Sequence, residues 1–144
     1  MFLFENKKLT QALEQLNACQ VSEKELSFTV AAIQRAVPFI TFMPDGTILD
    51  ANEQFLQLFD YRLDEIKGKH HRVLCDDTYV RSSEYKDFWQ NLNSGVAKHG
   101  HFPRITASSQ KVWLEASYFP VIDDNGHVVK IIKIANDITD IHNQ

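Results

Sequence analysis

The sequence predicts an α+β domain: a five-stranded antiparallel sheet with short helices on one face and an N-terminal helix. Two short apolar runs flank Asp45-Gly46, a pair that favours a hairpin turn. Segments with helical spacing follow, and then three stretches with alternating apolar residues, separated by turn residues at 107–110 and 123–126. Two strands, then helices, then three strands is an order typical of an α+β fold.

Composition limits the class of protein. The chain has 144 residues, of which 44% are hydrophobic and 24% charged, as expected for one globular domain with a core. A net charge of −4 argues against nucleic acid as the main partner. Cys19 and Cys75 lack metal-site spacing, and we expect reduced thiols. With neither a secretory signal pattern nor an apolar run of membrane-spanning length, we expect a cytoplasmic location and no membrane contact from this segment.

The first part of the chain, residues 2 to about 36, has helical spacing. Leu9, Leu13 and Leu16 recur on one helix face. Ser22 and Glu25 form a capping-box pattern, which favours an interruption within residues 17–25. Two interpretations stay open: a helix that dimerises or signals, and a helix that only covers one face of the sheet.

The stretch from Ile48 to Lys69 predicts a strand that turns directly into a short helix and then a second helical turn. Asn52 (or Asp50) is placed to cap the first helix. An apolar stripe follows on that helix, and a shorter turn covers 63–66 before Gly68. The stripe consists of Phe55, Leu58 and Phe59.

A further helix is predicted from Glu84 to Asn93, capped by Ser82 or Ser83. Its apolar face consists of Tyr85, Phe88, Trp89 and Leu92. Three strands are predicted after it, and Pro103 makes the first an edge or irregular strand. Their ranges are Ala97 to Thr106, Lys111 to Val121 and His127 to Asp137.

The pattern D-A-N-x-x-F-x-x-L-F-x-Y-x-x-x-E-I-x-G-K at residues 50–69 resembles PAS sensor domains. Further matches occur at 88–95, 113–120 and 137–139, so the resemblance covers roughly residues 38–139. It is closest to the N-terminal PAS domains of soluble or aerotaxis-type methyl-accepting chemotaxis receptors. The resemblance implies strand order 2-1-5-4-3 and a sensory, signal-transduction domain at 38–139. Residues 1–37 would be a helical cap, and 140–144 the start of an output linker.

The same resemblance implies a homodimer that signals to a downstream output domain through Asp137-Ile138-Thr139. A ligand-free dimerisation or interaction module is the alternative function. Another is a regulatory PAS domain of a histidine kinase or a cyclic-di-GMP enzyme. The sequence contains none of the usual catalytic motifs, and we expect no enzymatic activity.

Candidate cofactor residues also follow from the resemblance. Some chemoreceptor PAS domains bind haem b through a histidine near this position, so the metal ligand would be His71 or His70. Aerotaxis-type PAS domains bind FAD, for which Trp89, His71 and Arg72 are the candidates. Phe55 and Phe59 would line an apolar pocket, and a packed core without a cofactor is equally compatible with these residues. His99 and His101 share a strand face but lack a third metal ligand.

Overall fold

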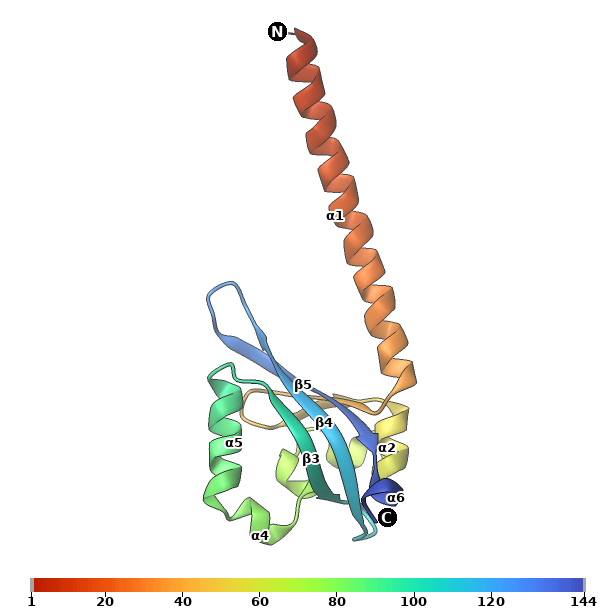
Figure 1. Cartoon of the computed structure of the whole chain (residues 1–144), viewed down its shortest axis with the longest axis vertical. Helices are drawn as coiled ribbons and strands as arrows, with labels where there is room; N and C mark the ends of the chain where they lie inside the picture. Colours follow the sequence, from red (N-terminus) through yellow and green to blue (C-terminus); the bar gives the residue numbers. More distant parts are fainter. Residues whose placement is uncertain (1, 144) are drawn as a thin grey trace. The chain divides into compact units, whose positions relative to one another are not determined.

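The computed structural model describes residues 2–143, with the side chains of 2–6 and 18–21 left out. The chain divides into two units, residues 1–34 and 35–144. The second unit contains a five-stranded antiparallel sheet with the order β2-β1-β5-β4-β3; Figure 1 labels its neighbouring strands β5, β4 and β3. This order confirms the predicted fold class and the topology that the PAS resemblance implies.

The strands lie close to the segments predicted from the Asp45-Gly46 turn and from the alternating pattern. The strands are β1 (Phe39–Phe42), β2 (Ile48–Ala51), β3 (Lys98–Ile105), β4 (Lys111–Ile122) and β5 (Val128–Asp137). Alternate residues of β4 and β5 point into the core, because successive side chains in a strand face opposite sides. The inward set of β5 contains Ile131, Lys133 and Ala135, so a lysine occupies a core position.

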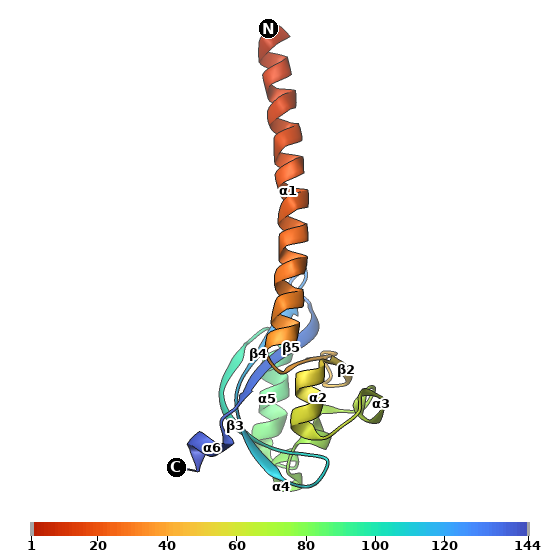
Figure 2. The same cartoon turned by 90° about the vertical axis from the view of Figure 1, so that its right-hand side faces the viewer.

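Short helices cover one face of this sheet. Figure 2 shows α2, α3 and α5 on the same side of the strands. The helical segments are α2 (Glu53–Phe59), α3 (Leu63–Ile66), the 3-10 turn η1 (His71–Leu74), α4 (Asp77–Val80), α5 (Ser83–Asn93) and α6 (Thr139–His142). The apolar face predicted for α5 is buried, and Ser82 caps this helix as expected.

Asn52 caps α2 and also ties it to the beginning of β1. Its Oδ1 accepts hydrogen bonds from the Phe55 and Phe39 amides, both at 3.0 Å. Its Nδ2 donates to the Val37 carbonyl at 2.7 Å. Of the two predicted caps, Asn52 is therefore the correct one.

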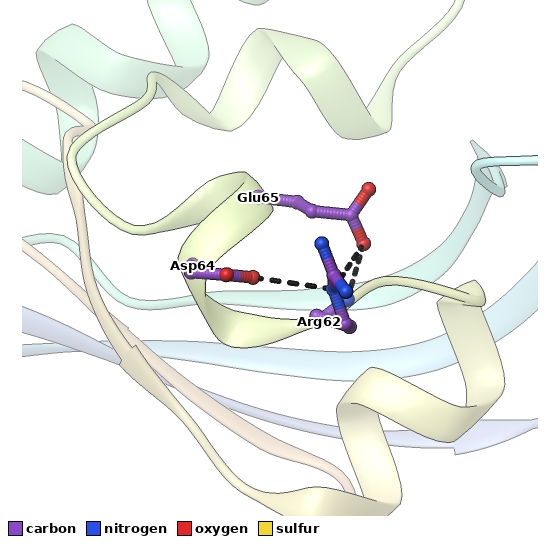
Figure 3. Close-up of polar contacts among 3 residues, drawn as sticks. All are labelled: Arg62, Asp64 and Glu65. Carbon is purple, nitrogen blue, oxygen red and sulfur yellow. Dashed lines mark hydrogen bonds and ion pairs between the residues drawn. The ribbon is translucent and has the colours of Figure 1, made fainter.

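The helix α3 begins with a cluster of charged side chains, shown in Figure 3. Arg62 Nε lies 3.4 Å from Asp64 Oδ1 and 3.7 Å from Glu65 Oε1, and the Arg62 amide donates to Glu65 Oε1 at 2.8 Å. All three side chains are exposed, so these ion pairs contribute roughly 0–1 kcal/mol to the stability of the fold.

Helix α1 (Phe2–Ala36), which the structure describes as continuous, forms the first unit and ends within the first residues of the second. The predicted interruption within residues 17–25 is therefore wrong. No glycine or proline breaks this stretch, and a capping preference of about 1 kcal/mol is too weak to stop an established helix. Among the described residues, no helix has both the length and the apolar character needed to cross a membrane.

The β1–β2 hairpin turns at Asp45 and Gly46, as predicted. Gly46 has a φ of +94° and lies directly against the imidazole of His70. A Cβ atom at this position would approach His70 Nε2 to 2.5 Å. The turn therefore needs glycine both for its backbone conformation and for this contact.

We expect Gly46→Ala to lower the free energy of unfolding by at least about 2 kcal/mol, because backbone strain and overlap with the His70 ring add together. Gly126→Ala is the matched control, since Gly126 has a similar φ of +82° and a Cβ added there would meet no atom within 4 Å. The control should cost about 1 kcal/mol. Equal losses in urea unfolding would show that contact with His70 is unimportant.

Candidate functional site: a buried polar cluster between sheet and helices

Polar groups are concentrated in the interior, between β4, β5 and the helices. Among the side chains that the structure describes, the buried polar or charged residues are His71, Arg104, Thr106 and Lys133. Three of these four residues are basic, and they lie among the aromatic rings of the core. Because buried charges are costly without partners, this cluster is the main candidate for a functional site.

His71 is fully buried at the first position of η1, with polar contacts to both ring nitrogens. Nδ1 lies 2.8 Å from the Tyr85 hydroxyl, and Nε2 lies 3.0 Å from the Tyr118 hydroxyl. Cys75 Sγ also lies 3.5 Å from Nδ1. Burial holds the pKa of His71 well below its usual value, and the positive charge of Arg104 lowers it further. His71 is therefore neutral at physiological pH.

Tyr118 links two of the buried basic residues. Its hydroxyl accepts a hydrogen bond from Arg104 Nη2 at 3.0 Å and bonds to His71 Nε2. Arginine can only donate, so the tyrosine hydrogen remains free to point at the histidine. Burial raises the pKa of Tyr118 to about 12, which keeps the phenol neutral.

Lys133 lies at the centre of β5 with 0% of its surface exposed. Its Nζ has no hydrogen-bond partner among the described residues and lies 4.9 Å from the centre of the Tyr118 ring and 5.8 Å from that of Phe55. Burial holds the pKa of this amine well below its usual value. Phe55, one of the two predicted pocket residues, thus lies beside this lysine, and it stacks on the other, Phe59, with ring centres 4.5 Å apart.

His70, Arg72 and Trp89 line a separate open groove of about 660 Å³ beside α5. His70 is held rigidly there: its Nε2 lies 2.8 Å from the Asp45 carbonyl, and its Nδ1 accepts from the Arg72 amide at 3.0 Å. The structure thus brings three predicted residues together in this groove. It puts His71, Phe55 and Phe59 in the interior, with Phe55 beside Lys133.

Neither haem nor FAD fits these residues as they lie. Iron needs one free imidazole nitrogen, yet both nitrogens of His70 and both of His71 have polar partners. The interior that would receive a flavin ring is filled by Phe55, Leu74 and Tyr118, each fully buried. The cofactor roles of the candidate residues remain predictions.

Sequence reasoning overlooked Arg104 and assigned no role to Lys133. A signal for Lys133 was present, since it alternates with the apolar Ile131 and Ala135 on one face of a strand. Arg104 follows Pro103 on a strand whose exposed residues obscure the alternation. Its burial depends on tertiary packing against Tyr79 and Tyr118, which lie far away in the sequence.

The fold agrees with the comparison to known families. A family model described as "PAS domain" matches residues 37–140. The chain therefore belongs to the PAS domain family, and it is a sensory domain.

Two curated relatives support this assignment. The Biofilm dispersion protein BdlA of Pseudomonas aeruginosa is 47% identical over 115 residues, which is 80% of this chain and 28% of the relative. The Oxygen sensor protein DosP of Escherichia coli is 25% identical over 103 residues, which is 72% of this chain and 13% of the relative. The chain thus spans only a small part of either relative.

Solved structures share the fold. A PAS domain from Colwellia psychrerythraea superposes with a TM-score of 0.66 at 21% identity, covering 80% of this chain and 98% of that one. An RNA-binding light-oxygen-voltage receptor superposes with a TM-score of 0.71 at 22% identity, covering 81% of this chain and 34% of that one.

We expect the buried, neutral His71 to make stability depend on pH. Below the unfolded-state pKa of 6.5 the unfolded chain binds a proton that the native state excludes. The free energy of unfolding should therefore decrease as the pH is lowered, by about 1.4 kcal/mol per pH unit for this group. His71→Gln keeps polar atoms at the site but does not titrate, so its curve should be flatter between pH 6.5 and 5.

Urea unfolding at several pH values measures this difference between the two proteins. Parallel curves for the native sequence and His71→Gln would mean that His71 takes up its proton in the folded state.

Proposed function

We propose that this chain is the sensory module of a chemotaxis-type receptor, in which a small ligand shifts the interior and the shift reaches an output helix. The sensory domain would occupy residues 38–139, preceded by the helical cap at 1–37 and followed by an output linker from 140. One observation carries this proposal: β4 holds both Tyr118 of the buried cluster and Trp113, which contacts the last helix.

The contact between the beginning of β4 and α6 is specific. The Ile138 amide donates to the Trp113 carbonyl at 2.8 Å, and the Trp113 amide donates to Thr139 Oγ1 at 3.0 Å. The Trp113 ring stacks on His142 with ring centres 3.8 Å apart. Asp137 Oδ1 accepts from both the amide and the hydroxyl of Thr139. A change in β4 would therefore act directly on the first turn of α6.

Tyr118 and Lys133 stand opposite each other in the β4–β5 pairing, and both side chains face the interior. A ligand that moved either side chain would act on the two strands that lead to Trp113 and Asp137. This is a shift between two populated arrangements of the sheet, which requires a ligand that prefers one of them.

The relatives fit a signalling role without defining the stimulus, since one is named for biofilm dispersion and the other for oxygen sensing. Haem and FAD are alternatives to a colourless ligand. An absorbance spectrum of freshly purified protein, and a second spectrum after haemin or FAD has been added and the unbound compound removed by gel filtration, separates them. Spectra that stay free of visible bands in both cases would favour the colourless ligand.

We expect Tyr118→Phe to speed amide hydrogen exchange at Trp113 and Ile138 by at least about fivefold, because the variant loses two buried hydrogen bonds, each worth about 1 kcal/mol. Phe119→Leu is the matched control on the opposite face of β4, where the side chain is 45% exposed. The control should leave both amides unchanged. Exchange that rises only around His71 in Tyr118→Phe would contradict transmission along β4.

A homodimer is the second part of the proposal. Exposed apolar side chains on α1, among them Leu9, Leu13 and Leu16, follow the i, i+4, i+7 spacing of a helix–helix contact. Such a contact would join two receptor subunits. The alternative function, a dimerisation module without a ligand, would need this same helix.

We expect the combined substitution of Leu9, Leu13 and Leu16 by Gln to convert a dimer into a monomer in light scattering, because the apolar contact is lost. Glutamine keeps a high helix propensity, so circular dichroism should stay unchanged. Glu14→Ala with Gln15→Ala, on exposed positions between these leucines, is the control. An unchanged mass for the leucine variant would exclude α1 as the dimer contact.

A further inference from the structure

We propose that the cavity between β3 and the α4–α5 segment binds a small monocarboxylate, whose carboxylate pairs with Arg104. This inference rests on the proposed sensory function and names the chemical class of its ligand. It is carried by a buried cation without a counter-ion, a cavity beside it, and the charges at the mouth of that cavity.

Arg104 is only 1% exposed, yet it is incompletely paired. Nη1 donates to the Pro103 carbonyl at 2.8 Å and Nη2 to the Tyr118 hydroxyl at 3.0 Å, while Nε has no partner among the described residues. Within the described part of the chain, no carboxylate is buried and none forms an ion pair with Arg104. A guanidinium stays charged when buried, so the site lacks an anion.

A cavity of about 500 Å³ has Arg104 in its wall. Tyr79 and Phe102 also line it, and their ring centres lie 5.5 and 5.1 Å from Arg104 Cζ. The volume is within the range of small-molecule sites, and aromatic walls around one convergent charge are typical of them. The two rings would contact the apolar body of a ligand whose carboxylate reaches the guanidinium.

The mouth of the cavity selects the ligand's charge. The exposed side chains of Asp76, Glu84 and Lys111 line it and together carry one net negative charge. A dianion or a phosphate would meet this charge, whereas a monoanion is neutralised by Arg104 inside. The site therefore favours a monocarboxylate with a flat or compact apolar body.

Binding at Arg104 would reach the proposed signalling path directly. Arg104 Nη2 bonds to the same Tyr118 hydroxyl that contacts His71, and Tyr118 lies on β4. A carboxylate that draws the guanidinium toward the cavity would lengthen or release this bond. The ligand would thus favour an arrangement of β4 different from that of the free protein.

The test is an NMR titration of the 144-residue chain with benzoate, acetate and cyclohexanecarboxylate up to about 10 mM, a concentration that saturates a site with a Kd of about 1 mM. We expect at least one carboxylate to shift the resonances of Tyr79, Phe102 and Arg104. Benzamide, the neutral analogue of benzoate, and phthalate, its dianionic relative, should bind at least tenfold more weakly than benzoate. Absence of shifts with all three monocarboxylates, or equal binding of benzamide, would overturn the proposal.

Arg104→Met removes the charge and keeps the length of the side chain. We expect it to weaken carboxylate binding at least tenfold without lowering the melting temperature, because a buried unpaired charge is replaced by an apolar group. A purely structural arginine would instead give a less stable protein with unchanged binding, which would overturn the proposal. Arg62→Met is the control, because Arg62 is exposed at the start of α3 and does not line this cavity, and it should bind as the native chain does.

The same titration separates this inference from the proposed function. Shifts at Tyr79 and Phe102 without any change in hydrogen exchange at Ile138 would support the carboxylate site and contradict signal transfer to α6. If hydrogen exchange at Ile138 responds to Tyr118→Phe but none of the carboxylates binds in the titration, the sensory function would be supported and the ligand class refuted.

Discussion

The Tyr118 hydroxyl is the contact on which the interior of this domain depends. It satisfies one nitrogen of the buried His71 and one of the buried Arg104, which reach it from the helical segment and from the edge strand. A purely apolar core would tolerate sliding of the sheet against the helices, whereas a hydrogen bond at 3.0 Å fixes one register. The same oxygen is sensitive to any ligand that competes for Arg104. The stability of the interior and its response to a ligand thus both depend on the Tyr118 hydroxyl oxygen.

The basic residues of this interior are stabilised in different ways. Desolvation lowers the pKa of His71 and of Lys133, so burial favours the neutral form of each. Arg104 cannot lose its proton, so it relies on hydrogen bonds and on the rings of Tyr79 and Phe102. Among the described side chains, Arg104 is therefore the one permanent buried charge. A ligand that supplies the opposite charge interacts most strongly at this residue.

The fold was predictable because its signals are local. Asp45-Gly46, the Asn52 cap and the alternation along β4 each depend on a few neighbouring residues. The candidate site was less predictable, because its contacts join residues far apart: His71 meets Tyr118 across 47 positions. His70 and His71 were equivalent candidates in the sequence. In the structure, His70 bonds to the β1–β2 hairpin at Asp45, whereas His71 lies in the core. A local signal can also mislead: the capping pattern at Ser22 and Glu25 predicts a break, yet α1 continues through it.

Asn52 and the pairing of β1 with β5 have a consequence for how such a domain can be used. The chain comes into the domain at Val37 and Phe39, both bonded to Asn52, and Phe39 pairs with Ile134 near the end of β5. The two junctions therefore lie on neighbouring strands. A domain with adjacent junctions can be inserted in a longer chain, or repeated in tandem, without separating the segments on either side. A twist applied to one flanking segment would pass to the other across a single strand pair.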